Sequence, residues 1–155
     1  MTRAEILQEI TRAKIAHKRW VKRADHLISG LPVEKEFIPL ASTSCGFGKW
    51  LYGQGRSLRD IDIIRYIMEE IEMHHNDVHD TYSEIYKIFF IMPENKSFLS
   101  KVFTFNSKRV SKKGKKQAEL YFEQLRKSSE ELLKLLEKLE QETIYITYEQ
   151  LLNAK

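Results

Sequence analysis

Three histidines and the only cysteine of this 155-residue chain are the residues whose types and spacing indicate chemistry. His75 and His79 lie four residues apart, so in a helix both imidazoles project from one face and can bind one metal ion. His17 and Cys45 are the further candidate ligands. Three imidazoles and one thiolate complete a tetrahedral shell, and a closed shell of that kind is typical of structural zinc. The sequence therefore predicts a Zn²⁺ site.

Apolar residues at intervals of three and four predict the helices that position two of these groups. The first helix begins with a capping box at Thr2 and Glu5, and Gly30 with Pro32 ends it. Its predicted inner stripe contains Ile6, Ile10, Ala13, His17, Trp20, Ala24 and Leu27. A long helix opening at Ser57 and Asp60 carries the stripe Ile61, Ile64, Met68, Ile71, His75, Val78, Tyr82, Ile85 and Phe89, with His79 on the same side. Both helices are thus expected to direct histidines inward.

A short helix and a last long helix complete the expected fold. Residues Cys45 to Tyr52 form the short helix, which Gly53 and Gly55 end. A final helix over about 111–141, capped by Ser107 or Ser111, carries the seam Ala118, Tyr121, Leu125, Ser128, Leu132, Leu135 and Leu139. The sequence therefore predicts an all-α protein, a four-helix bundle with a short extra helix that carries the cysteine, as a single domain over residues 1–155.

The environment of the candidate ligands can also be predicted. A lone histidine on an apolar stripe is most often a hydrogen-bonded core residue, but two imidazoles buried one turn apart repel each other on protonation, and a metal removes that problem. Cys45 begins a short helix, whose dipole and free N–H groups favour a thiolate. Gly46 and Gly48 are expected to allow close backbone approach to the sulfur, and Phe47 and Trp50 to cover it; Trp20 and Trp50 are expected to keep water out. His26 and His74 fall off the stripes and are predicted to lie on the surface.

Composition limits the classes of partner and compartment. The net charge is +4, and six cations between Lys108 and Lys116 predict a basic connector over about 106–116. No aromatic residue alternates with these lysines, so no nucleic acid is expected as a partner. No apolar run approaches the roughly 20 residues of a membrane span, and no secretory signal is recognisable. A single cysteine agrees with a reducing cytoplasm, so we expect a cytoplasmic protein that does not insert into membranes.

The motifs His17-x-x-Trp20, Cys45-Gly46-Phe47-Gly48-Lys49-Trp50-Leu51-Tyr52-Gly53 and His75-x-x-x-His79 resemble the chemoreceptor zinc-binding domain (CZB) family over about residues 13–82. The resemblance implies that His17, Cys45, His75 and His79 bind Zn²⁺ in a four-helix bundle that is often a homodimer. It also implies a bacterial signalling role in chemoreceptor or diguanylate cyclase pathways, where zinc occupancy or oxidation of the cysteine changes the output. The chain shows no GGDEF sequence and no long chemoreceptor hairpin, so its signal is expected to act on a separate signalling protein, or the chain is part of a larger one.

Two other readings of the sequence are open. A di-iron bundle that binds oxygen or acts as a metalloenzyme uses Glu-x-x-His pairs, and Glu72 stands three residues before His75, although no second copy of the motif occurs. The leucine seam of the last helix would instead suit an interaction protein. The closed four-donor shell leaves no position for an activated water, so we expect no enzymatic activity.

Overall fold

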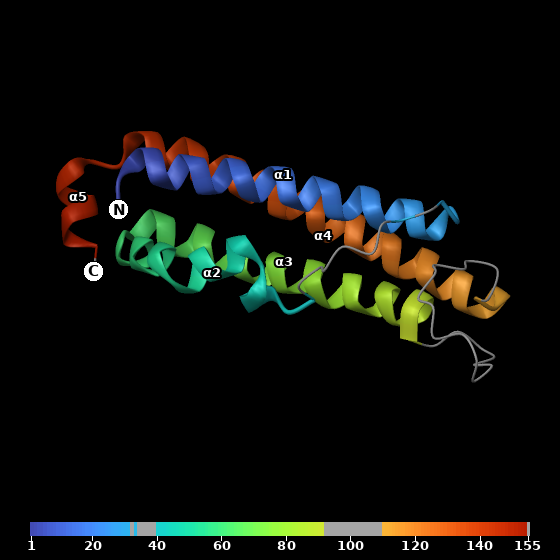
Figure 1. The fold of residues 1–155 in the computed structure, drawn as a ribbon. Coiled ribbons are helices and arrows are strands. Elements are labelled where there is room, and N and C mark those ends of the chain that lie inside the picture. Colours follow the sequence, from blue (N-terminus) through green and yellow to red (C-terminus); the bar gives the residue numbers. More distant parts are fainter. Residues whose placement is uncertain (32, 34–39, 92–109, 155) are drawn as a thin grey trace.

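The computed structural model describes residues 1–31, 33, 40–91 and 110–154, and all of its regular elements are helical (Figure 1). In chain order they are α1 (Arg3–Ile28), the 3₁₀ turn η1 (Ser42–Ser44), α2 (Gly46–Tyr52), the 3₁₀ segment η2 (Gln54–Asp60), α3 (Asp62–Tyr86), the π-helical turn η3 (Lys87–Ile91), α4 (Lys112–Tyr145) and α5 (Tyr148–Asn153). The predicted all-α class is confirmed.

Helix α1 forms as its capping signals predict. The Thr2 hydroxyl accepts the Glu5 N–H, and the Glu5 carboxylate accepts the Thr2 N–H, which satisfies two of the free donors at the helix start. Beyond the helix end, Gly30 adopts a φ of 73°, a conformation that most other residues avoid. The predicted inner stripe is buried except for Trp20, which is half-buried. His17 therefore points into the core.

Helix α3 starts later than predicted and carries the predicted stripe from Ile64 to Ile85, whereas Phe89 lies in the following π-helical turn η3. Ser57 and Asp60 do not open it; both lie in η2, where the Ser57 hydroxyl donates to the Gln54 carbonyl. Ile61 occupies the N-cap position of α3, and Ile61 and Leu58 are both buried. Burial of these two side chains therefore sets the helix start in place of a side-chain cap. His75 and His79 are both on the buried side of α3, as predicted.

Helix α4 begins after Ser111, one of its two predicted caps, but it runs further than predicted and buries a different set of seam residues. Ser111 is its N-cap and accepts the Gly114 N–H at 3.0 Å, so the lysines from 112 to 116 belong to the first turns of α4 rather than to a connector over 106–116. Residues 106–109, Ser107 among them, lie outside the described residues. The helix continues past 141 to Tyr145. Its buried residues are Ala118, Leu125, Ser129, Leu132, Leu136, Leu139 and Thr143.

The buried seam of α4 thus passes through Ser129 and Leu136, where the sequence pattern suggested their neighbours Ser128 and Leu135. An apolar stripe with alternating spacings of three and four residues can be drawn through either set, because Ser128 and Ser129 are adjacent, as are Leu135 and Leu136. The choice depends on α4 packing against two helices, α1 and α3, at once. Local periodicity alone does not contain that information.

The three long helices lie side by side, and α4 packs against both α1 and α3 while running in the opposite direction (Figure 1). The short α2 contacts α1 and η2, and η2 in turn contacts α3. In the described part of the chain the bundle therefore consists of three long helices closed by α2 and η2, with α2 carrying the cysteine at its start as predicted. No helix within the described ranges is long and apolar enough to cross a membrane.

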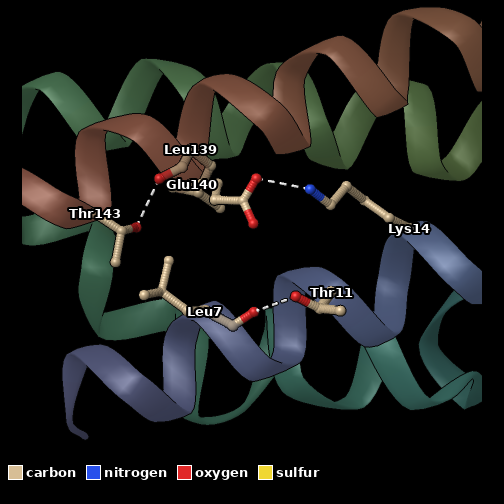
Figure 2. A network of polar contacts seen from close by, with 6 residues as sticks. All are labelled: Leu7, Thr11, Lys14, Leu139, Glu140 and Thr143. Carbon is tan, nitrogen blue, oxygen red and sulfur yellow. Dashed lines mark hydrogen bonds and ion pairs between the residues drawn. The ribbon is translucent and has the colours of Figure 1, made fainter.

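Polar contacts between α1 and α4 fix their relative position near the N-terminus (Figure 2). The Lys14 ammonium donates to the Glu140 carboxylate at 2.7 Å, and this partly buried pair joins the two helices. The buried Thr143 hydroxyl donates to the Leu139 carbonyl at 2.6 Å, so this hydroxyl is satisfied within the core. Helix α1 therefore packs mainly against α4.

Candidate metal centre

The four predicted ligands come from three elements and are all buried. His17 is on the inner stripe of α1, and His75 and His79 are one turn apart on α3. Cys45 is the N-cap of α2. The exposed fractions are 3% for His17, 7% for Cys45, 0% for His75 and 1% for His79. Burial of three imidazoles and a thiol at one place requires a compensating interaction.

The structure brings these groups together from segments far apart in sequence. His17, His75 and His79 form a group in which the possible ligand atoms all lie within 4.8 Å of one another. Cys45 adjoins this group through His75, with its Sγ 3.2 Å from the His75 Nε2. In a tetrahedral site with Zn–N bonds of about 2.0–2.1 Å and a Zn–S bond of about 2.3 Å, neighbouring donors lie about 3.3–3.6 Å apart. The donor spacing is therefore close to that of a zinc site.

Backbone carbonyls orient two of the imidazoles. The His17 Nδ1 donates to the Ala13 carbonyl at 2.7 Å, and the His79 Nδ1 donates to the Leu40 carbonyl at 3.0 Å. Because a carbonyl only accepts, Nδ1 carries the proton in both rings and Nε2 keeps its lone pair. Such outer contacts commonly fix the tautomer of metal-binding histidines. The role of the Ala13 carbonyl could have been predicted, because Ala13 lies four residues before His17 in the same helix. Nothing in the sequence marks Leu40 as the partner of His79.

Two ring nitrogens in the cluster have no partner. The His79 Nε2 and the His75 Nδ1 are buried and make no hydrogen bond to the described residues. An unsatisfied buried polar atom costs about 1–3 kcal/mol, so such atoms are rare without a reason. A cation bound by the Nε2 lone pair would satisfy His79. The residues present therefore fit a metal ion.

The electrostatics of the histidines suit metal binding. Burial lowers the pKa of His17 to about 4, and burial together with repulsion from the other two histidines lowers the pKa of His75 to about 3. Burial also lowers the pKa of His79. All three rings are thus neutral at pH 7, which is the form that binds a metal.

The protonation state of Cys45 in the metal-free site differs from the predicted thiolate. Its Sγ accepts the Gly48 N–H at 3.1 Å, which favours the thiolate as expected for the start of a helix. Burial is the larger effect and raises the pKa of the Cys45 thiol. The expected preference for a thiolate is therefore wrong for the metal-free site, because removal from water outweighs one turn of a short helix. A bound cation would supply the missing charge, since thiols that coordinate metals are deprotonated.

Aromatic rings surround the cluster. Trp20 packs edge-on to His79 with ring centroids 4.4 Å apart, and Phe47 packs edge-on to His75 at 5.2 Å and to His17 at 5.8 Å. Trp50 stacks on Phe47 at 5.7 Å and so forms a second layer. The prediction that Trp20 and Trp50 limit water access agrees with these positions, and Phe47 is the ring that touches two histidines.

The two glycines next to the cysteine have different roles. A Cβ on Gly48 would lie 1.8 Å from the Ser42 carbonyl oxygen and 3.4 Å from the Cys45 sulfur, so no side chain fits there. A Cβ on Gly46 would meet nothing within 4 Å. The prediction of close backbone approach holds for Gly48 and is wrong for Gly46.

The remaining candidates lie outside the cluster. Glu72 forms an ion pair with Arg59, and the metal-binding group found among the described residues contains no carboxylate. This geometry does not favour the di-iron reading, which needs carboxylates between the metals. His26 and His74 are half-buried rather than fully on the surface, and neither belongs to the group.

The lowered histidine pKa values predict that acid destabilises the metal-free protein. The unfolded chain binds protons at these histidines below about pH 6.5, whereas the folded chain does not until about pH 4 for His17. The free energy of unfolding is therefore highest above about pH 6.5. As the pH is lowered below that value, it decreases by about 1.4 kcal/mol per pH unit for each such histidine. Urea unfolding of chelator-treated protein at pH 7, 6 and 5 measures this slope. A variant with His17→Asn and His75→Asn should show a shallower slope, and equal stability of the unaltered chain at pH 7 and pH 5 would contradict the prediction.

Comparison with known proteins agrees with this geometry. The family model described as the chemoreceptor zinc-binding domain (CZB) matches residues 17–86, or 70 of the 155 residues. The match begins at His17 and includes Cys45, His75 and His79. Searches of curated proteins and of solved structures gave no significant match. The family description and the donor set of the cluster both indicate Zn²⁺ as the metal.

Proposed function

This chain belongs to the chemoreceptor zinc-binding domain family, and we propose that it is a bacterial cytoplasmic sensory module in which His17, Cys45, His75 and His79 hold one Zn²⁺. Occupancy of the site, or oxidation of Cys45, changes the packing of the helices and thereby the activity of a partner. When bound, the zinc ion supplies a fixed tetrahedral charge that holds these donors together.

One observation carries the proposal: a buried cluster of candidate ligands joins α1, α2 and α3. His17 comes from α1, the other two histidines from α3, and Cys45 reaches His75 at 3.2 Å from the start of α2. The clearest packing of α1 and α3 is against α4. Loss of one donor would therefore free α1 and α2 to move relative to α3, which is the packing change that a sensor requires.

The donor count supports regulation rather than catalysis. Four protein donors fill a tetrahedral shell, whereas catalytic zinc sites keep a position for water or substrate. The cluster is also nearly closed to solvent, with no ligand more than 7% exposed. A site of this kind contributes folding free energy, so its occupancy is coupled directly to structure.

Cys45 is the donor that an oxidant can change. Hypochlorous acid converts a thiolate to a sulfenic acid by transferring its oxygen to sulfur and releasing chloride, and the neutral product is a poor metal ligand. A slower oxidant such as hydrogen peroxide should react less readily with a buried, metal-bound sulfur. The cysteine is unpaired, as this reaction requires.

The partner is proposed to be a second copy of this chain or a separate signalling protein. The outward side of α3 exposes Ile63, Tyr66 and Met73, with exposed fractions of 56%, 68% and 54%. These residues recur at helical spacing on the same helix that carries two of the histidines. Movement of α3 would thus alter an apolar surface available to a partner.

The test follows zinc release, the mass of Cys45 and the oligomeric state while hypochlorous acid is added to zinc-loaded protein. We expect zinc release to rise in step with addition of one oxygen at Cys45. Cys45→Asp keeps an anionic ligand that hypochlorous acid does not oxidise, so it should retain its zinc at doses that empty the unaltered chain. Release at the same dose from both proteins, or release without modification of Cys45, would show that Cys45 is a ligand only and not the oxidant sensor.

A further inference from the structure

The wall of aromatic rings on one side of the metal centre is rigid. Phe47 contacts both His17 and His75 and is 5% exposed. Trp50, 7% exposed, stacks behind it. A Cβ added to Gly55 would lie 3.0 Å from three atoms of the Trp50 indole, so the backbone fits closely against that ring. Phe47 therefore cannot turn away from the histidines unless a second packed layer moves with it.

The other side is closed by a single indole. Trp20 lies against His79 at a centroid distance of 4.4 Å and against Tyr82 at 5.2 Å. Trp20 is half-buried, whereas His79 is 1% exposed and Tyr82 is 1% exposed. Among the described residues, two rings outside the cluster contact its imidazoles, and Trp20 is the more exposed of the two, since Phe47 is 5% exposed. Its ring is thus the boundary between His79 and water.

Trp20 belongs to α1 and His79 to α3, so the indole covers the histidine across a helix boundary. His79 is held from outside the cluster by one hydrogen bond, from its Nδ1 to the Leu40 carbonyl. A shell of four protein donors has no free position, so exchange of its ion requires that one donor turn away first. His79 can do so only after the indole beside it has moved.

We propose that Trp20 is the gate of the metal centre, which sets the rate of zinc exchange while the ligands set the affinity. This inference rests on the zinc centre proposed above. The edge-to-face contact between Trp20 and His79 must break before the indole can move, and loss of such a contact corresponds to a few-fold to about tenfold in a rate. Removal of the indole should therefore accelerate exchange by about tenfold.

A gate has a kinetic signature that a structural support lacks. Because the indole obstructs both entry and departure, its loss raises the association and dissociation rates by the same factor and leaves Kd unchanged. A residue that only stabilises the occupied site would change dissociation and Kd together when it is removed. The two roles can thus be separated by measuring both rates on the same proteins.

The experiment uses the full chain with zinc as the probe. Zinc transfer to a chromogenic chelator gives the dissociation rate, and stopped-flow binding to metal-free protein, followed by tryptophan fluorescence, gives the association rate. The variants are Trp20→Ala and Trp20→Phe, with Tyr86→Ala as the control because that partly buried ring stacks on Phe90, outside the cluster. We expect both rates to rise by about tenfold for Trp20→Ala, by less for Trp20→Phe, and by less than about twofold for Tyr86→Ala.

The outcomes distinguish this inference from the function on which it rests. If the unaltered chain binds no stoichiometric zinc, the proposed metal centre itself is wrong. If it binds one zinc but the Trp20 variants exchange at the unaltered rate, or Kd rises with the dissociation rate, the gate is wrong and the centre stands. Circular dichroism of the metal-free variants checks their folding, and Trp20→Phe keeps a ring in place if Trp20→Ala does not fold.

Discussion

Replacement of Cys45 or His79 by alanine is expected to abolish tight zinc binding at one ion per chain. Each change removes a proposed donor from a buried cluster in which the structure offers no replacement among the described residues. Loss of an outer hydrogen-bond partner costs roughly 10- to 100-fold in metal affinity, so loss of a donor should cost more than that. Metal analysis after dialysis against a competing chelator measures the remaining stoichiometry.

The chain provides matched controls for this prediction. His26 and His74 are histidines outside the cluster, and His26→Ala and His74→Ala should keep one zinc per chain. Helicity measured by circular dichroism shows whether each variant folds without metal. A double variant with His75→Ala and His79→Ala removes two of the four donors. If that variant still held stoichiometric zinc, the ligand set proposed here would be wrong.

Removal of zinc is expected to lower the midpoint of thermal unfolding by roughly 10 °C. A ligand that binds only the folded state at about 1,000 times its Kd stabilises that state by about 4 kcal/mol. For a chain of this size each kcal/mol corresponds to about 2–4 °C. The loss should leave a helical protein, because the apolar stripes of α1, α3 and α4 remain buried against one another. Thermal unfolding with and without a chelator measures the difference.

Hydrogen exchange can locate the effect of zinc removal. We expect faster amide exchange in α2 and in the turns of α1 and α3 around the histidines, because the candidate ligands join these three helices there. The interface of α3 with α4 should change less, since it is formed by apolar side chains along both helices. Coincident melting curves for the zinc-loaded and chelated protein would remove the structural role of the metal.

The candidate ligands and the main helices could be predicted from the sequence because their signals are local. The spacing of His75 and His79, the capping box at Thr2 and the apolar stripes of α1 and α3 each depend on residues within a few turns. Helical geometry converts such spacing directly into a shared face. The single cysteine among glycines and aromatic residues pointed to Cys45 for the same reason. The sequence itself therefore determined which residues are candidate donors and which face of each helix is buried.

Tertiary structure alone decided how these parts meet. The Leu40 carbonyl that orients His79 carries no sequence signal, because any residue has a carbonyl and only its position matters. The register of the α4 seam through Ser129 and Leu136 depends on packing against two helices at once. The pKa of Cys45 is raised, against the local expectation, because burial outweighs the N–H groups at the start of α2. Periodicity and capping act within one helix, whereas burial and donor geometry arise only when helices distant in the sequence pack together.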